Sequence, residues 1–276
     1  MRCVWCHNPE SWLSQPQILY KKTKCIGCHS CVDVCPQQAI QLTHEGIQLT
    51  ANACLACGKC SDACPTTALE MCGREWTMEA LMEEIEKERD IMVDSGGGVT
   101  LCGGEPLMHP HYTLELLREL GRRGFHRAVD TTLYASADIV RTVAEECELL
   151  LVDLKLMDSE KHQRYTGVPN EIILQNIRLL YERGCNFVIR IPLIEAINAD
   201  EENIEATARF LSSLTTAPST ITVHFLPYHD VGKDKHRRMW STYNPQQYLM
   251  AAPSDETLAR CKQQIEAHGL HVIVGG

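Results

Sequence analysis

The sequence predicts an α/β fold in which parallel strands form a barrel or part of one, interrupted near its start by a small cysteine-rich module. After Gly73, short apolar runs alternate with amphipathic segments, which is typical of strands and helices around a parallel sheet. Before Gly73, residues 25–72 are rich in cysteine and poor in long periodic segments. With 276 residues, 44 % of them apolar, the chain can form one large domain and a smaller one.

Six apolar runs are predicted to be strands: residues 98–102, 127–131, 149–155, 187–194, 221–226 and 271–275. Between them lie segments with a helical pattern: residues 78–89, 112–123, 137–146, 171–183, 204–214 and 255–267. In such barrels the loops that follow the carboxyl ends of the strands carry the chemistry. Functional residues are therefore expected directly after the predicted strands.

Composition excludes several classes of protein. The formal net charge of −10 and the pI near 5.6 argue against a protein that holds nucleic acid or anionic lipid by general attraction, and we assign no nucleic-acid role. No run of about 18 apolar residues is present and nothing near Met1 has the order of a secretion signal, so we expect a cytoplasmic protein without a membrane segment. Eight of the fifteen cysteines fall in two short metal-type runs, which favours a reducing compartment over a disulfide scaffold.

The motif Cys-x2-Cys-x2-Cys-x3-Cys-Pro occurs twice, and the second copy begins 29 residues after the first. In this spacing three cysteines wrap one face of an iron-sulfur cube, and the fourth, before proline, reaches the neighbouring cube. Zinc also binds Cys-x2-Cys pairs, but the doubled spacing suits zinc poorly. We expect two 4Fe-4S clusters, one held by Cys25, Cys28, Cys31 and Cys64 and the other by Cys54, Cys57, Cys60 and Cys35.

A further Cys-x2-Cys pair, Cys3 and Cys6, stands at the start of the chain in MRCVWCHNPES. This stretch resembles the radical S-adenosylmethionine (radical SAM) superfamily, whose Cys-x3-Cys-x2-Cys signature would place one more cysteine four positions before Cys3. The resemblance implies that three cysteines bind three irons and leave the fourth iron open for SAM. Because superfamily members also carry a first strand upstream, we expect that the chain begins late. With one thiolate absent, we expect its third cluster to be unstable and its activity low or absent.

The segment TLCGGEPLMHP places Gly103, Gly104 and Glu105 directly after a predicted strand, where glycines let the backbone approach a ligand closely. Taken alone, Gly-Gly-Glu is more often a simple turn. In this position it resembles the superfamily's Gly-Gly-Glu motif, which holds the SAM amino group. With the preceding SGGGVTL and the following Pro106, it resembles more narrowly the activating enzymes of glycyl-radical enzymes, the group of pyruvate formate-lyase activase. Many of these carry a double-cluster insert.

The resemblance covers nearly the whole chain, because DTTLYA, VDLKLMDSEKHQRYTGVPN, IRIPLI and HFLPYHDVGKDK follow in the family's order. It implies a partial (β/α)6 TIM-type barrel of the radical SAM kind with a small bacterial-ferredoxin-like insert. The start of the core would occupy residues 1–24, the insert residues 25–72 and the rest of the barrel residues 73–276.

Position in these blocks implies the residues of the SAM pocket: Asp130, Thr131, Asp153, Lys155, Arg190 and His229. SAM brings a carboxylate, a ribose and an adenine, which call for a cation, hydroxyl acceptors and a flat contact. In the pyruvate formate-lyase activase group two aspartates also help to hold a monovalent cation. Without the resemblance, Asp153 and Lys155 would be interpreted as an ion pair at the barrel rim and His229 as a loop histidine. No ligand role is assigned to the remaining cysteines: Cys72, Cys102, Cys147, Cys185 and Cys261.

The implied reaction is reductive cleavage of SAM to methionine and a 5'-deoxyadenosyl radical. In this family the radical takes hydrogen from a backbone glycine of a partner, a glycyl-radical enzyme, whose identity the sequence does not reveal. The resemblance further implies three 4Fe-4S clusters in all, flavodoxin or ferredoxin as the electron donor, and a monomer. Two alternatives remain open: another radical SAM maturase with auxiliary clusters, although those clusters usually follow the barrel, and a non-catalytic 4Fe-4S electron carrier.

Overall fold

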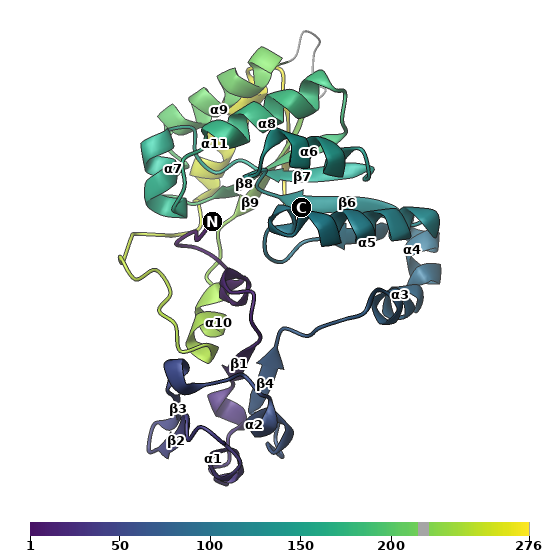
Figure 1. Cartoon of the computed structure of the whole chain (residues 1–276). Coiled ribbons are helices and arrows are strands. Elements are labelled where there is room, and N and C mark those ends of the chain that lie inside the picture. Colours follow the sequence, from purple (N-terminus) through teal and green to yellow (C-terminus); the bar gives the residue numbers. More distant parts are fainter. Residues whose placement is uncertain (215–220, 276) are drawn as a thin grey trace. The chain divides into compact units, whose positions relative to one another are not determined.

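The structure, a computed structural model, describes residues 1–214 and 221–275. It divides into two compact units (Figure 1). We call the first the sheet unit; it comprises Met1–Cys3, Thr77–His229 and Gln247–Gly276. The second, the cysteine unit, comprises Val4–Trp76 and Asp230–Gln246.

The sheet unit is built on six parallel strands in the order β10-β9-β8-β7-β6-β5. Each neighbour in the sheet is also the neighbour in sequence, as expected where strand and helix alternate. The predicted α/β fold with a parallel sheet is therefore confirmed, and every predicted strand is present within two residues at each end. The bounds are β5 (Gly98–Leu101), β6 (His126–Thr131), β7 (Leu149–Asp153), β8 (Phe187–Leu193), β9 (Thr222–Pro227) and β10 (His271–Val274).

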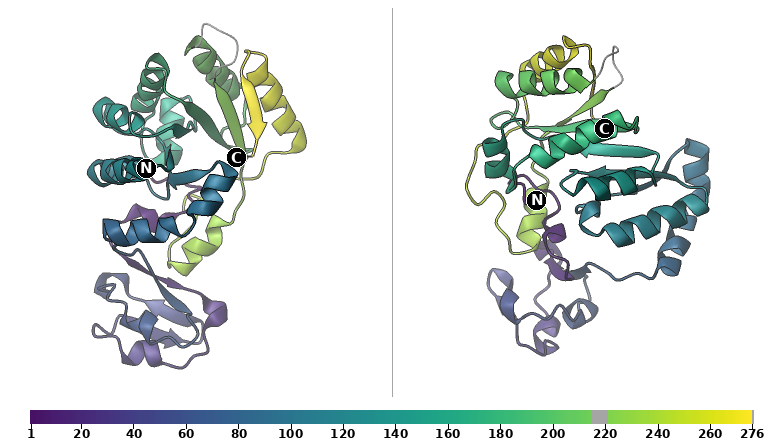
Figure 2. Two further views of the ribbon diagram at one scale, coloured as in Figure 1. Left: turned by 90° about the vertical axis from the view of Figure 1, so that its right-hand side faces the viewer. Right: turned by 45° about the horizontal axis from the view of Figure 1, so that its top comes forward.

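Helices lie along one face of this sheet (Figure 2). The predicted helix at 78–89 corresponds to α3, which ends at Glu86. The sequence analysis missed the next helix, α4, which begins at Arg89, and the helix that follows β7. That helix, α7, contains many polar residues and buries only His162 and Thr166, so it carries no apolar periodicity. The helices are α3 (Met78–Glu86), α4 (Arg89–Ser95), α5 (Pro110–Arg122), α6 (Ala137–Ala144), α7 (Ser159–Thr166), α8 (Glu171–Glu182), α9 (Glu201–Leu214) and α11 (Asp255–Glu266).

Side-chain alternation gives the sheet two different faces. Val129, Val152 and Ile189 are fully buried in the main apolar core against the helices. The residues that follow them, Asp130, Asp153 and Arg190, are only partly buried, and they project to the opposite face. That face is where charged groups can meet a ligand without interrupting the core.

The cysteine unit repeats its backbone every 29 residues. Matching positions in the two copies adopt the left-handed conformation, as in Gly27 and Ala56, although alanine rarely does so. His29 with Gly58 and Gln38 with Thr67 form the other such pairs. The secondary structure repeats too: α1 (Ser30–Asp33) matches α2 (Lys59–Asp62), and β2 (Ile40–Thr43) matches β4 (Leu69–Cys72).

Two sheets complete this unit: β1 (Gln17–Tyr20) pairs with β4, and β2 pairs with β3 (Gly46–Leu49), both antiparallel. The unit is larger than the segment 25–72 expected from the cysteines, because it includes β1 and the later helix α10 (Gly232–Arg238). Lys235 of this helix binds Glu10 at 2.7 Å, and Arg238 binds Glu70 of β4 at 2.8 Å. Because these ion pairs join residues that are far apart in the sequence, a local sequence pattern does not predict them.

None of the described helices combines the length and the apolar composition needed to cross a bilayer.

Replacing Gly98 by alanine should destabilise the sheet unit, because a Cβ there would lie 2.2 Å from the carbonyl oxygen of His126. This contact is with the backbone of the neighbouring strand, so it can be relieved only by moving β5. We expect a loss of about 1–3 kcal/mol in the free energy of unfolding, measured by urea denaturation. Thr100→Ala, on the same strand, should stay within about 0.5 kcal/mol. Equal stability of the two variants would contradict this account of the close approach.

Candidate functional site

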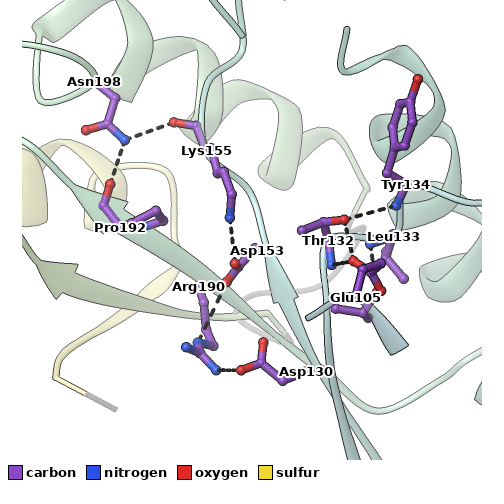
Figure 3. Close-up of polar contacts among 11 residues, drawn as sticks. Glu105, Asp130, Thr132, Leu133, Tyr134, Asp153, Lys155, Arg190, Pro192 and Asn198 are labelled. Carbon is purple, nitrogen blue, oxygen red and sulfur yellow. Dashed lines mark hydrogen bonds and ion pairs between the residues drawn. The ribbon is translucent and has the colours of Figure 1, made fainter. Parts of the chain in front are cut away.

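Glu105 is held at the end of β5 by donors from the next strand (Figure 3). Its carboxylate accepts hydrogen bonds from Thr131 Oγ1 at 2.6 Å, from the backbone N–H of Thr132 at 2.8 Å and from Thr132 Oγ1 at 2.5 Å. The backbone N–H of Leu107 adds a fourth bond at 3.2 Å. The loop after β5 is thereby joined to the carboxyl end of β6. Thr132 was not singled out by the sequence, because hydroxyl residues are common in loops.

Gly103 precedes this carboxylate with a φ of +108°, which side-chain-bearing residues rarely adopt. A Cβ at this position would meet no atom within 4 Å. The backbone conformation, and not crowding, therefore requires glycine here. Gly103 and Gly104 are both exposed, so the backbone of this loop is open to a ligand.

Four charged residues form a continuous line across three neighbouring strands and the loop after β7 (Figure 3). Arg190 Nη1 of β8 donates to Asp130 Oδ2 of β6 at 2.7 Å, and Lys155 Nζ donates to Asp153 Oδ2 at 2.6 Å. Arg190 Nε lies 3.9 Å from Asp153 Oδ1, which links the two pairs. The β7–β8 register places Asp153 opposite Arg190. Two anions and two cations thus lie together near the carboxyl ends of the strands.

Burial controls the protonation of this line. It raises the pKa of Asp130, and the nearby Asp153 carboxylate raises it further, while Arg190 acts in the opposite direction. For Lys155, which is 6 % exposed, burial acts to lower the pKa, but Asp153, Cys3 and Asp130 outweigh it and the net pKa is raised. Lys155 therefore keeps its positive charge beneath the surface.

Two polar atoms in this line make no hydrogen bond within the part of the chain that the structure describes. Asp153 Oδ1 and Arg190 Nε are both buried without a hydrogen bond. Buried polar atoms normally find partners, because an unmade hydrogen bond costs about 1–3 kcal/mol. An acceptor and a donor in this state are suited to a bound ligand, cation or water.

Asn198 fixes the backbone on which Lys155 stands. Its side-chain amide donates to the carbonyl oxygen of Lys155 at 2.9 Å and to that of Pro192 at 2.7 Å (Figure 3). Asn198 is fully buried, and it joins the loop after β7 to the end of β8. Sequence reasoning missed this residue. A buried asparagine gives no local signal, because its role is defined only by partners far away in the chain.

The remaining residues predicted for this site lie in different places. Cys3 belongs to the sheet unit and acts electrostatically on Lys155. The adjoining backbone is anchored by a hydrogen bond of 2.8 Å from the Arg2 N–H to the carbonyl of Thr166. His229 is exposed, two residues after β9. Cys6 belongs to the cysteine unit.

The eight cysteines of the duplicated motif surround two cavities. Cavity I, about 340 Å³ when space open to solvent is counted, is lined by Cys25, Cys28, Cys31 and Cys64. Cavity II, about 330 Å³ on the same basis, is lined by Cys54, Cys57, Cys60 and Cys35. Each cavity therefore joins three cysteines of one copy to the fourth cysteine of the other, which is the grouping expected from the sequence. All fifteen cysteines are free of disulfides.

Replacing Arg190 should reveal the electrostatic repulsion between the two carboxylates of the charged line. In Arg190→Met the carboxylates of Asp130 and Asp153 lose their shared cation, so we expect a loss of about 3 kcal/mol in unfolding free energy at pH 7. Because the pKa of Asp130 is already raised and would rise further, the penalty should shrink as pH falls toward 5 and the folded protein takes up protons.

Urea denaturation at both pH values measures this penalty. Arg178→Met, which replaces an arginine of α8 outside the line, is the control. A penalty that is the same at pH 7 and pH 5 would show that lost packing, and not charge, accounts for the effect.

Comparison with known proteins identifies the family. The model of the radical SAM superfamily matches residues 1–211. The trans-4-hydroxy-L-proline dehydratase activating enzyme of Clostridioides difficile is 39 % identical over all of this chain and 90 % of its own length. The choline trimethylamine-lyase activating enzyme of Oleidesulfovibrio alaskensis is 37 % identical over 99 % of this chain and 89 % of its own.

A solved structure supports the same assignment. A domain of the pyruvate-formate lyase-activating enzyme of Bacteroides vulgatus matches with a TM-score of 0.55 and 46 % identity, over 65 % of this chain and 99 % of that domain. The superfamily implies a 4Fe-4S cluster and SAM as cofactors. The chain belongs to the radical SAM superfamily and, within it, to the activating enzymes of glycyl-radical enzymes.

Proposed function

We propose that this protein activates a glycyl-radical enzyme by removing a hydrogen atom from one backbone glycine of that partner. The observation that carries the proposal is the placement of Glu105 and the Asp130–Arg190–Asp153–Lys155 line at the strand ends, in a chain that matches activating enzymes along its whole length. Glycine suits such a target because it has no side chain and permits a close approach.

The charged line and Glu105 suit the polar groups of SAM. The buried ammonium of Lys155 and the guanidinium of Arg190 can pair with its carboxylate, while the fixed carboxylate of Glu105 can accept from its amino group. Leu151 and Val188, paired in register on the same face, add an apolar lining that keeps water from the reacting atoms. When bound, the reduced cluster supplies the electron that splits SAM into methionine and the 5'-deoxyadenosyl radical.

Three 4Fe-4S clusters would serve this reaction. Cys3 and Cys6 would be ligands of the one that faces SAM, and cavities I and II would hold the other two. The support for the second pair is the gathering of four thiols around each cavity. Asp130 and Asp153 would also hold a monovalent cation, since Asp153 Oδ1 is a buried acceptor that makes no hydrogen bond among the described residues.

Flavodoxin or ferredoxin is the proposed electron donor. Ile26 and Leu55, which line cavities I and II, are 67 % and 68 % exposed, so a donor can come close to either cluster. We propose that the enzyme acts as a monomer, because one chain supplies all the residues named here. The relatives act with different partners at similar identity, so the proposal extends to the class of partner alone.

Iron content tests the two cavities. In anaerobically reconstituted protein, Cys60→Ala should remove about four irons, because one cube loses a buried ligand. Cys102→Ala, an exposed cysteine outside both cavities, should remove none. Electron paramagnetic resonance (EPR) tests whether the fourth cysteine of each copy belongs to the other copy's cavity. Cys64 and Cys28 line cavity I, so the spectrum of Cys64→Ala should match that of Cys28→Ala and differ from that of Cys57→Ala, which affects cavity II. Matching spectra of Cys64→Ala and Cys57→Ala would refute the crossed grouping.

SAM binding and cleavage test the sheet-unit site. In anaerobically reconstituted protein, Lys155→Met should weaken SAM binding at least tenfold, because a charge-assisted bond worth about 1.5–3 kcal/mol is lost. Lys161→Met, on α7, is the matched control and should leave the affinity unchanged. Calorimetry gives the affinity, and release of 5'-deoxyadenosine with dithionite gives cleavage. Unchanged affinity in Lys155→Met would overturn the assignment of this residue.

A further inference from the structure

Cavities I and II are built by the same repeated backbone, but different side chains line them. A shift of 29 residues along the sequence relates matching positions of the two copies. Ser30, at cavity I, matches Lys59, at cavity II, and Thr66, at cavity I, matches Gln37, at cavity II. Strand β1, which lies outside the repeat, contributes Ile18 to cavity II and Tyr20 to cavity I. Tyr20 and Thr66 thus bring hydroxyl groups to the lining of cavity I, and Ser30 places a third beside its Cys28, whereas no residue that lines cavity II has a hydroxyl group.

Two of these hydroxyl groups contact cysteine sulfurs directly. Ser30 Oγ lies 3.4 Å from Cys28 Sγ, and Thr66 Oγ1 lies 3.7 Å from Cys64 Sγ. A hydroxyl group that donates to a cysteine sulfur stabilises negative charge on that sulfur. Both contacts therefore favour negative charge on sulfur atoms that line cavity I.

The third hydroxyl group, that of Tyr20, is held in place from two sides. The Tyr20 ring stacks on Trp240 with centroids 5.7 Å apart and an interplanar angle of 4°. Its oxygen accepts a hydrogen bond of 3.3 Å from the Ile47 N–H, so its own proton remains available to donate. Tyr20 and Cys25 line the same cavity, so the hydroxyl lies on the wall that also carries this thiol.

Gly46 and Trp240 show that the position of this hydroxyl is built into the fold. A Cβ at Gly46 would lie 2.6 Å from Tyr20 Oη, so the chain leaves space for the hydroxyl. The Trp240 indole is fixed in turn by a hydrogen bond of 3.1 Å to the carbonyl of Ile47. Tyr20 itself is 7 % exposed, which keeps water from competing for its proton.

We propose that Tyr20, Ser30 and Thr66 raise the reduction potential of the cluster in cavity I above that of the cluster in cavity II. The inference rests on the proposed function, which places a 4Fe-4S cluster in each cavity. Reduction adds negative charge that spreads onto the sulfur ligands, so hydrogen bonds to those sulfurs stabilise the reduced form more than the oxidised form. An electron shared by the two clusters would then reside mainly in cavity I.

Other groups do not cancel this difference. The Ala39 N–H donates to Cys35 at 3.3 Å, and the Ala68 N–H donates to Cys64 at 3.2 Å. Each cavity therefore has one backbone donor of this kind, and the two donors do not distinguish the cavities. Cavity II has one additional N–H donor, from Ala56 to Cys54 at 3.4 Å. Lys59 brings a positive charge near cavity II, but it is exposed and screened by solvent. Two hydroxyl–sulfur contacts and the buried Tyr20 hydroxyl at cavity I outweigh one backbone donor and a screened charge at cavity II.

A redox titration followed by EPR tests the inference on the whole chain. Cys3→Ala/Cys6→Ala protein is used as the background, so that only the clusters in the two cavities contribute. Tyr20→Phe/Ser30→Ala/Thr66→Val should lower the higher of the two midpoint potentials and leave the lower one unchanged. We expect the electron's preference for cavity I to fall about tenfold, which is about 59 mV for a one-electron couple. The single variant Tyr20→Phe should shift the same midpoint in the same direction, and it serves if the triple variant does not fold.

The reciprocal change provides a matched control. Gln37→Thr/Lys59→Ser introduces hydroxyl groups at cavity II, and it should raise the lower midpoint. If the hydroxyl-deficient variants shift the lower midpoint, or shift neither one while the iron count stays at about eight per chain, the inference is wrong. A background protein with fewer than eight irons would contradict the proposed cluster sites instead, so the two failures are distinguishable.

Discussion

Parallel pairing in register is the constraint on which the catalytic end of the sheet unit depends. Because β7 and β8 run in the same direction, Asp153 lies beside Arg190, and both point away from the helices. Strand β6, on the other side of β7, carries Asp130, which accepts a hydrogen bond from the Arg190 guanidinium. A slip of one residue in any of these strands would move a charge into the apolar core. The hydrophobic face that packs on the helices therefore also sets the spacing of the polar groups.

The same arrangement keeps the site charged although it is partly withdrawn from water. Burial opposes ionisation of both Asp130 and Lys155. For Lys155 its partners outweigh burial and the net pKa is raised, whereas for Asp130 the Asp153 carboxylate adds to burial, Arg190 opposes both, and the pKa remains raised. The compensation is incomplete, since an oxygen of Asp153 and a nitrogen of Arg190 are buried without a hydrogen bond among the described residues. A site of this kind has a defined gap in its hydrogen bonding, and a zwitterionic ligand such as SAM has groups of both signs to fill it.

In the cysteine unit the constraint is the repeated backbone. Left-handed residues recur at matching positions, even at His29, Gln38 and Ala56, where a side chain makes that conformation unfavourable. The strain persists because each loop must turn its thiols toward one cavity. Because the repeated backbone shapes both cavities in the same way, the hydroxyl groups that distinguish them come from side chains of the repeat and from β1, which lies outside it. Tyr20 and Ile18, two residues apart on that strand, face cavities I and II respectively.

The sequence by itself determined the alternation of strands and helices, the grouping of eight cysteines into two crossed sets and the charged residues at the strand ends. These features are local, since periodicity and ligand spacing are written along the chain. Tertiary structure alone decided which partners meet: Thr132 with Glu105, Asn198 with Lys155, and Trp240 with Tyr20. It also extended the cysteine unit to include α10, about 160 residues beyond β4 in sequence. Such contacts depend on packing between distant segments, and a buried asparagine or tyrosine carries no local pattern that announces its partner.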